Sequence, residues 1–227
     1  MSLFFEFQKY SADFNMEFDN FLLEHCEAHD IDMALRFYGW SPPAVTLGRN
    51  QTKFGIDEEF CRQNNISIAR RTTGGRALLH ADEITYCVVL KKSLFKNSLS
   101  LFDCYKEITD VLVGAFADEG VNLEYNEYRK AASSSGYCMN LATVADVNCN
   151  GKKFIGSAQF RKNTHILQHG SIPLSFDRKL LSEIFVEEKD FGHIIALDEI
   201  SSSLNLEQVM LNIKKGFEEK FKSAKCK

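Results

Sequence analysis

The chain has 227 residues, of which 44% are hydrophobic and 26% charged, and its formal net charge is -4. This composition is typical of globular proteins, and the length predicts one domain over residues 1–227. The slightly acidic balance and the short apolar runs exclude nucleic acid and membrane as expected partners. The first ten residues lack a basic-then-apolar signal pattern, which favours a cytoplasmic protein.

In the first part of the chain, the pattern of apolar residues predicts strands and helices without strict alternation. Ser11 is expected to cap the first helix. The predicted elements are a strand at 4–9, a helix from Ser11 to about His29, strands at 33–38 and 44–47, a helix at 57–63 and a strand at 66–70.

The second part continues the mixed pattern, with Asn150-Gly151 as a tight turn between two strands. The predicted elements are strands at 77–80, 84–90 and 121–125, a helix at 101–118, a hairpin of strands 142–148 and 153–160, a strand at 165–171, and helices at 180–185 and 207–221, the last capped by the serine loop 201–203. Together they predict an α+β fold with a mixed or antiparallel sheet flanked by helices.

Lys153 stands on the predicted hairpin just before three small residues, Gly156, Ser157 and Ala158. Such residues leave room for a ligand against the backbone, and regular alternation would place Lys153, Ile155 and Ser157 on one face. The alternative is a solvent-exposed lysine at a hairpin end. Cys138 follows a loop rich in serine and glycine, so a thiol and an amine near a small-residue cleft suggest acyl chemistry.

The loop 72–76, called the glycine loop below, carries Gly74-Gly75 between arginines at 70, 71 and 76. Exposed N–H groups and guanidinium groups suit a phosphate or a carboxylate. The alternative is a hairpin turn with a solvated basic rim. His80 and His169 each either contact a ligand or pair with a nearby carboxylate, and neither belongs to an H-x-x-x-H pair. The seven cysteines show no C-x-x-C spacing, so we expect free thiols and no metal site.

Several motifs, in order, resemble the lipoate–protein ligase and octanoyltransferase superfamily, which includes the biotin ligases. They are residues 14–16, 35–49 and Gln51, 70–80, 151–159 and 169–171. The form Gly74-Gly75-Arg76-Ala77 is most similar to the cysteine-dependent octanoyl-[acyl carrier protein]:protein N-octanoyltransferases, which also keep a cysteine at the position of Cys138. The resemblance implies a catalytic domain like those of class II aminoacyl-tRNA synthetases and biotin ligases, here without a C-terminal accessory domain.

The resemblance also implies a function and a site. The enzyme would move an octanoyl group from acyl carrier protein to a lipoyl-domain lysine, as in glycine cleavage H protein or an E2 subunit, without a cofactor. The alternatives are a lipoate–protein ligase that uses ATP and Mg²⁺, an amidotransferase and a non-catalytic lipoyl-domain binder. Cys138 and Lys153 would be catalytic, and Tyr38, Trp40, Leu78 and Ile155 are candidate walls of an acyl tunnel. The expected substrate-binding residues are Arg49, Arg70, Arg71, Thr73, Gly74, Gly75, Arg76, His80, Gly156, Ser157, Ala158, Gln159, His169 and Gly170.

Overall fold

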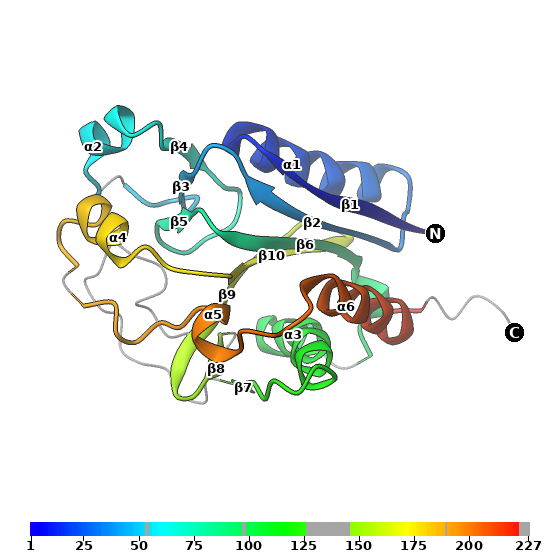
Figure 1. Cartoon of the computed structure of the whole chain (residues 1–227). Coiled ribbons are helices and arrows are strands. Elements are labelled where there is room, and N and C mark those ends of the chain that lie inside the picture. The colour runs from blue at the N-terminus through cyan, green and yellow to red at the C-terminus, as the bar shows by residue number, and fades with distance from the viewer. Residues whose placement is uncertain (53–54, 97–98, 126–145, 189, 223–227) are drawn as a thin grey trace, which may run out of the picture.

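A computed structural model describes residues 1–52, 55–96, 99–125, 146–188 and 190–222 of the chain. Its centre is a seven-stranded sheet in which β1 and β2 are parallel and the other neighbours antiparallel (Figure 1). The predicted mixed sheet is therefore confirmed. The strands lie in the order β1 (Ser2–Tyr10), β2 (Met33–Trp40), β6 (Glu83–Lys91), β10 (His165–Pro173), β9 (Lys152–Arg161), β8 (Val147–Cys149) and β7 (Glu124–Tyr125).

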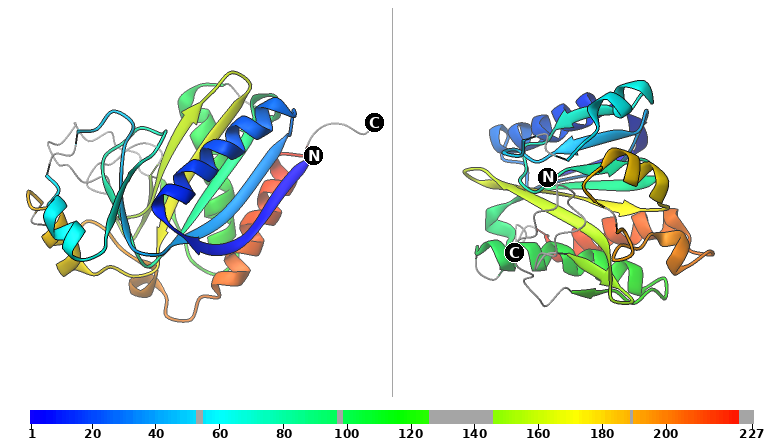
Figure 2. Two further views of the ribbon diagram at one scale, coloured as in Figure 1. Left: turned by 90° about the horizontal axis from the view of Figure 1, so that it is seen from above. Right: turned by 90° about the vertical axis from the view of Figure 1, so that its left-hand side faces the viewer.

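Helices cover both faces of this sheet, as Figures 1 and 2 show. The helix α1 (Ala12–Ala28) packs on one face in a core with Leu167 of β10, and α3 (Leu101–Ala117) and α6 (Leu206–Lys220) pack together on the other. Among the helices that the structure describes, none has both the length and the apolar character needed to cross a bilayer.

A smaller sheet lies at one end of the molecule and has its own core. It consists of β4 (Ser67–Arg70), β3 (Ala44–Leu47) and β5 (Leu78–His80), in that order. The helices α2 (Glu58–Gln63) and α4 (Arg178–Ile184) contribute Cys61 and Leu181 to this core. The loop from β4 to β5 contains the glycine loop, which reaches the main sheet where the Thr73 hydroxyl lies 2.7 Å from His169 Nε2 of β10.

The helix boundaries follow their capping residues. The hydroxyl of Ser11 accepts a hydrogen bond from the Phe14 N–H, which confirms the predicted start of α1. The predicted cap of the last helix is wrong, because Asn205 rather than the serine loop accepts the first N–H groups. Two short elements were not predicted, the 3₁₀-helix η1 (Lys92–Leu94) and α5 (Leu197–Ile200).

The turn between β8 and β9 has the predicted geometry. Asn150 and Gly151 both have positive φ, 52° and 72°, as a two-residue hairpin turn requires. The pairing of the two strands shifts between Val147 and Asn148, so β9 carries one extra residue, Phe154. Regular alternation, which predicted one shared face for Lys153 and Ile155, is therefore interrupted. Residues 142–145 of the predicted hairpin lie outside the described residues.

Candidate active site

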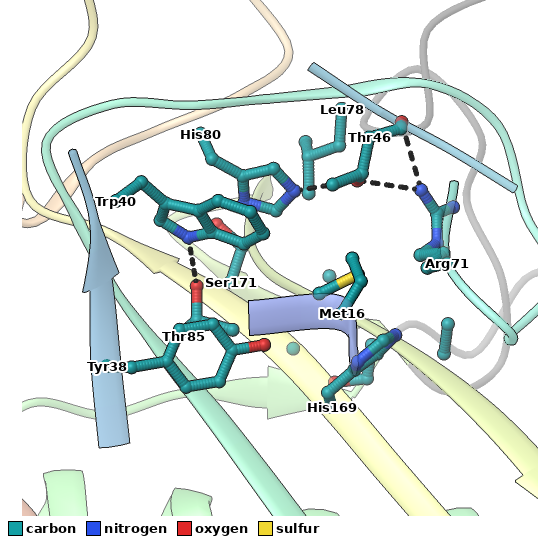
Figure 3. Close-up of a pocket in the computed structure, with 14 residues that line it drawn as sticks. Met16, Tyr38, Trp40, Thr46, Arg71, Leu78, His80, Thr85, His169 and Ser171 are labelled. Atoms are coloured by element: carbon teal, nitrogen blue, oxygen red, sulfur yellow. Dashed lines mark hydrogen bonds between the residues drawn. The ribbon is translucent and has the colours of Figure 1, made fainter. Parts of the chain in front are cut away.

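A pocket opens where α1, the main sheet and the smaller sheet meet (Figure 3). Its empty space, including the open mouth, is about 430 Å³. Most of the surface that lines it is apolar, with a few polar groups directed inward. The lining residues are Met16, Tyr38, Trp40, Thr46, Arg71, Leu78, His80, Thr85, Gly156, Ser157, Ala158, His169, Gly170 and Ser171.

One wall is organised by the buried carboxylate of Glu83, at the start of β6. The Trp40 indole N–H and the Ser171 hydroxyl donate to it over 3.1 and 2.5 Å, Thr85 also donates, and His80 Nδ1 lies 2.7 Å away. Burial alone would raise the pKa of Glu83. The attraction of His80 and the hydrogen bonds outweigh burial and hold that pKa below its ordinary value. Glu83 is therefore an ionised acceptor that fixes the orientation of His80.

His80 links Glu83 to the smaller sheet. Its Nδ1 faces the Glu83 carboxylate, and its Nε2 lies 2.8 Å from the hydroxyl oxygen of Thr46. The Thr46 oxygen in turn accepts from Arg71 at 3.0 Å. The imidazole also stacks on the Trp40 indole, with ring centroids 4.0 Å apart. The predicted alternative, a histidine paired with a nearby carboxylate, is confirmed for His80, which also faces the pocket.

The opposite wall repeats this arrangement around Asp19 of α1. His169 Nδ1 lies 2.9 Å from Asp19 Oδ2, and His169 Nε2 lies 2.7 Å from the hydroxyl of Thr73. Asp19 also accepts from the Tyr38 hydroxyl at 2.9 Å and from Arg36 at 3.2 Å. Burial of Tyr38 and the negative charge of the neighbouring Asp19 hold the pKa of Tyr38 well above its ordinary range, so the phenol stays protonated and donates.

Asp19, Arg36 and Glu83 were not among the predicted site residues. On the first helix, the apolar pattern, the Ser11 cap and the motif at residues 14–16 do not mark Asp19. Glu83 could have been recognised, because it follows His80 by three residues. The pairing of Asp19 with His169 joins residues 150 positions apart and depends on how α1 packs on the sheet.

The arginines beside the glycine loop hold loops together. Arg71 is 6% exposed, and its guanidinium donates to the carbonyls of Thr46, Gly74 and Arg76 over 3.1, 3.0 and 2.7 Å. Arg70 donates to the Gly48, Arg49 and Gln51 carbonyls over 2.6, 3.2 and 2.7 Å. Arg71 is therefore buried, unlike the solvated basic rim of the alternative hypothesis, whereas Arg70 is exposed and still donates to carbonyls.

Residues 48–51 pack directly against the glycine loop. A Cβ built on Gly48 would lie 1.9 Å from the Gly75 carbonyl oxygen, so only glycine fits there. The Arg49 N–H donates to the Thr73 carbonyl over 2.8 Å, and the Arg49 guanidinium lies 5.2 Å from the Phe160 ring centroid. Gly75 has a φ of 94°. The glycine loop is therefore fixed from the side of β3 as well as from the pocket.

Lys153 is buried, which excludes the solvent-exposed alternative. Its Nζ lies 2.9 Å from Asp146 Oδ2, and the two side chains are 7% and 2% exposed. The Lys153 backbone pairs with residues 193–195, which fixes the position of the strand. Cys138, the predicted nucleophile, lies outside the described residues, in the segment 126–145 that ends immediately before Asp146.

The described cysteines are poor nucleophiles. All five, at positions 26, 61, 87, 104 and 149, are buried. Burial raises the pKa of Cys26 and of Cys61 to about 11, with help from Asp57 and Glu58 at Cys61. Burial, with Asp19 as a second cause, raises the pKa of Cys87 well above its ordinary value. Burial also raises the pKa of Cys104 and Cys149. Because the thiolate is the reactive form, none of these five is suited to attack.

Of the other predicted residues, some line the same pocket and others do not. Tyr38, Trp40 and Leu78 line it as predicted, whereas Ile155 is not among the lining residues and is buried in the core under α3. Gln159 donates to Gln168, which continues through Tyr86 to Ser157 behind the pocket. Within the described residues, no cluster of three or more His, Cys, Asp and Glu side chains could hold a metal ion.

Residues 11–218 match the family model described as the lipoyl protein ligase A/B catalytic domain. The chain belongs to this family. An octanoyltransferase LipM from Exiguobacterium sp. is 36% identical over 183 residues, covering 77% of this chain and 66% of the relative. Those from Exiguobacterium sibiricum and Clostridioides difficile are 33% and 32% identical, covering 90% and 94% of this chain and 81% and 84% of the relatives. The chain thus spans roughly two thirds to five sixths of these family members.

Solved structures confirm the fold. A bipartite lipoate protein ligase from Thermoplasma acidophilum, studied with its E2 lipoyl domain, has a TM-score of 0.69 at 17% identity, covering 96% of this chain and 84% of that one. P. falciparum LipL1 in complex with lipoate has a TM-score of 0.74 at 17% identity, covering 97% and 62%. A biotin protein ligase from Aquifex aeolicus has a TM-score of 0.51 at 12% identity, covering 97% and 70%. The predicted biotin ligase-like fold class is therefore correct.

Proposed function

We propose that this chain is an octanoyltransferase of lipoate biosynthesis, which moves an octanoyl group from acyl carrier protein to a lipoyl-domain lysine through a thioester on Cys138. The observation that carries the proposal is the match, over most of the chain, to relatives named octanoyltransferase LipM. The pocket supports it, because a largely apolar space lies beside the glycine loop and the small residues of β9.

The pocket would hold the acyl chain. An octanoyl group has six methylenes, and burial at about 0.8 kcal/mol each supplies about 5 kcal/mol of binding. Met16, Tyr38 and Trp40 provide apolar surface for that chain. The hydroxyl of Tyr38 already donates to Asp19, and the indole N–H of Trp40 already donates to Glu83. An acyl chain packed against these two rings would therefore leave neither polar group without a hydrogen bond.

In the first step the Cys138 thiolate attacks the carbonyl carbon of the octanoyl thioester. The tetrahedral oxyanion then collapses and expels the thiolate of the carrier, which takes up a proton, and the acyl group is left on Cys138 as a thioester. A cysteine thiol with a pKa of about 8.5 needs a positive environment to ionise. Lys153 is the buried cation on the neighbouring hairpin, and Asp146, which holds it, directly follows the segment that contains Cys138.

In the second step the ε-amine of the acceptor lysine attacks the thioester of the acyl-enzyme. The amide forms, the Cys138 thiolate leaves, and a base takes the proton of the amine. Because the acyl group is already activated in both thioesters, the two-step reaction needs neither ATP nor Mg²⁺. Lipoyl domains such as glycine cleavage H protein or E2 subunits would be the acceptors, and the E2 lipoyl domain studied with the Thermoplasma ligase supports that class.

A transfer assay tests the proposal. The protein is mixed with octanoyl acyl carrier protein and an unmodified lipoyl domain, and intact mass spectrometry follows the octanoyl group. Wild type should transfer it without ATP, and Cys138→Ala should neither transfer it nor accumulate an acyl-enzyme. Cys61→Ala is the matched control, because Cys61 is buried and is not among the residues that line the pocket.

The outcomes separate the candidate activities. Full transfer by Cys138→Ala would show that the thioester route is wrong. A parallel reaction with free lipoate and labelled ATP tests the ligase, which would release AMP and modify the lipoyl domain. An octanoylated protein that serves as the only donor would indicate an amidotransferase, and the absence of any mass change with every donor would indicate a binder.

A further inference from the structure

We propose that Asp19 is a positioning residue, which acts through His169 and Thr73 to hold the glycine loop against the acyl pocket. The inference rests on the proposed function, because it names a residue needed for that reaction. Asp19 belongs to α1, His169 to β10 and Thr73 to the loop between the smaller strands, so the contact joins three separate parts of the fold.

The chain of contacts is continuous and buried. Asp19, His169 and Thr73 are 2%, 7% and 0% exposed, and the successive distances are 2.9 and 2.7 Å. Since Arg36 and Tyr38 also donate to Asp19, the carboxylate cannot turn without losing three partners. A fully satisfied buried polar network of this kind holds its members in one arrangement.

A second hydrogen bond connects α1 to the glycine loop. Thr72 donates to the side-chain carbonyl of Asn20, the residue that follows Asp19 on α1. Asn15, one turn earlier, accepts from Arg36 over 2.5 Å and donates to the Gly39 carbonyl over 3.0 Å, which ties α1 to β2. The face of α1 formed by residues 15, 19 and 20 therefore connects the main sheet to the glycine loop.

The loop has groups that need positioning. Gly74 and Gly75 are exposed, and a Cβ on Gly74 would meet no atom within 4 Å, so a ligand has access to this backbone. In the described part of the chain, neither glycine N–H donates a hydrogen bond, whereas the Gly74 carbonyl is held by Arg71. Backbone N–H groups directed at a developing oxyanion stabilise it only if they are fixed in advance.

The decisive variants change the hydroxyl of Thr73. Thr73→Val keeps the shape of the side chain but removes the group that meets His169 Nε2, and Thr73→Ser keeps that group. Thr109→Val is the matched control. Thr109 is a fully buried threonine on α3, away from the pocket, and its hydroxyl has no partner within the described residues.

The first measurement is the steady-state rate of octanoyl transfer. We expect Thr73→Val to lower kcat by about tenfold to a hundredfold with little change in the KM for octanoyl acyl carrier protein, because misplaced groups reduce the rate more than binding. Thr73→Ser should recover most of kcat, and Thr109→Val should match wild type. If Thr73→Val retains wild-type kcat, or if Thr73→Ser is equally slow, the hydroxyl does not position the loop.

The second measurement needs no turnover. Hydrogen exchange of a peptide that spans the glycine loop should be faster in Thr73→Val than in wild type, and unchanged in Thr109→Val. Asn20→Ala removes the side chain that accepts from Thr72 and lies at a half-buried position, so it should also speed this exchange. It provides the test if Thr73→Val does not fold. Unchanged exchange in every variant that folds would overturn the proposal. A wild-type protein that transfers no octanoyl group would contradict the proposed function, whereas the exchange result would still decide the role of Asp19.

Discussion

Gly48→Ala tests whether the close contact between residues 48–51 and the glycine loop is needed for stability and activity. The new Cβ would lie 1.9 Å from the Gly75 carbonyl oxygen and 2.7 Å from its carbon. Protein Cβ atoms do not approach such atoms closer than 3.0 Å, so the two backbones must separate by about 1 Å (3.0 minus 1.9). The glycine loop is held on its other side by α1, so this separation cannot be absorbed without loss of contacts.

The expected cost has two parts. Overpacking of this kind destabilises a protein by about 1–3 kcal/mol. A displacement of about 1 Å in a group that positions substrate can lower the rate by about 10²-fold. The free energy of unfolding in urea gives the first value, and kcat for octanoyl transfer gives the second, measured where the variant is fully folded.

Gly114→Ala is the control for this substitution. Gly114 is exposed within α3, and a Cβ there would meet nothing within 4 Å. Because alanine favours the helix more than glycine, we expect this variant to gain about 0.5–1 kcal/mol with unchanged kcat. Wild-type stability and wild-type kcat in Gly48→Ala would refute the close-packing argument.

Three further predictions concern the sheet, the hairpin and the carboxylate in the pocket wall. Gly170→Ala would place a Cβ 2.6 Å from the Tyr86 ring, so it should lose about 1–3 kcal/mol in urea unfolding; wild-type stability would contradict this packing. Lys153→Met removes the buried ion pair with Asp146 and should cost about 3–5 kcal/mol, with much of the loss recovered when Asp146→Asn is added; additive losses would show that the pair is not coupled. Glu83 has a pKa lowered from 4.5 in the folded protein, so its ionised form adds stability above that pH, and the contribution is lost as pH falls through the lower folded pKa. The stability difference between wild type and Glu83→Gln should therefore shrink below about pH 4.5 in thermal unfolding, and a difference that is constant from pH 7 to 3 would contradict the assignment.

The sequence predicted most elements of the fold because local signals mark them. The hydroxyl of Ser11 at the start of α1 and the pair Asn150-Gly151 in the hairpin act through neighbouring atoms, so they can be read without tertiary structure. The extra residue Phe154 in β9 has no such signal, since the irregularity arises from pairing with β8 on one side and residues 193–195 on the other.

The candidate site was predicted less completely for a related reason. Motif residues such as His80 and His169 were found, but their carboxylate partners were not. Asp19 is brought to His169 only by the packing of α1 on the main sheet, and a charge within an amphipathic helix resembles an ordinary solvated one. The expected anion contacts of Arg70 and Arg71 stay a prediction, and in the structure these side chains donate to backbone carbonyls.

The position of the octanoyl group between the two half-reactions is the most direct test of the thioester route through Cys138. The protein is mixed with octanoyl acyl carrier protein in the absence of a lipoyl domain, quenched in acid, digested, and the modified peptide is identified by tandem mass spectrometry. We expect one octanoyl group on Cys138, removed by the addition of an unmodified lipoyl domain, which then carries it on lysine. An octanoyl group on a different residue, or transfer to the lipoyl domain with no modified Cys138 at any time, would contradict the account.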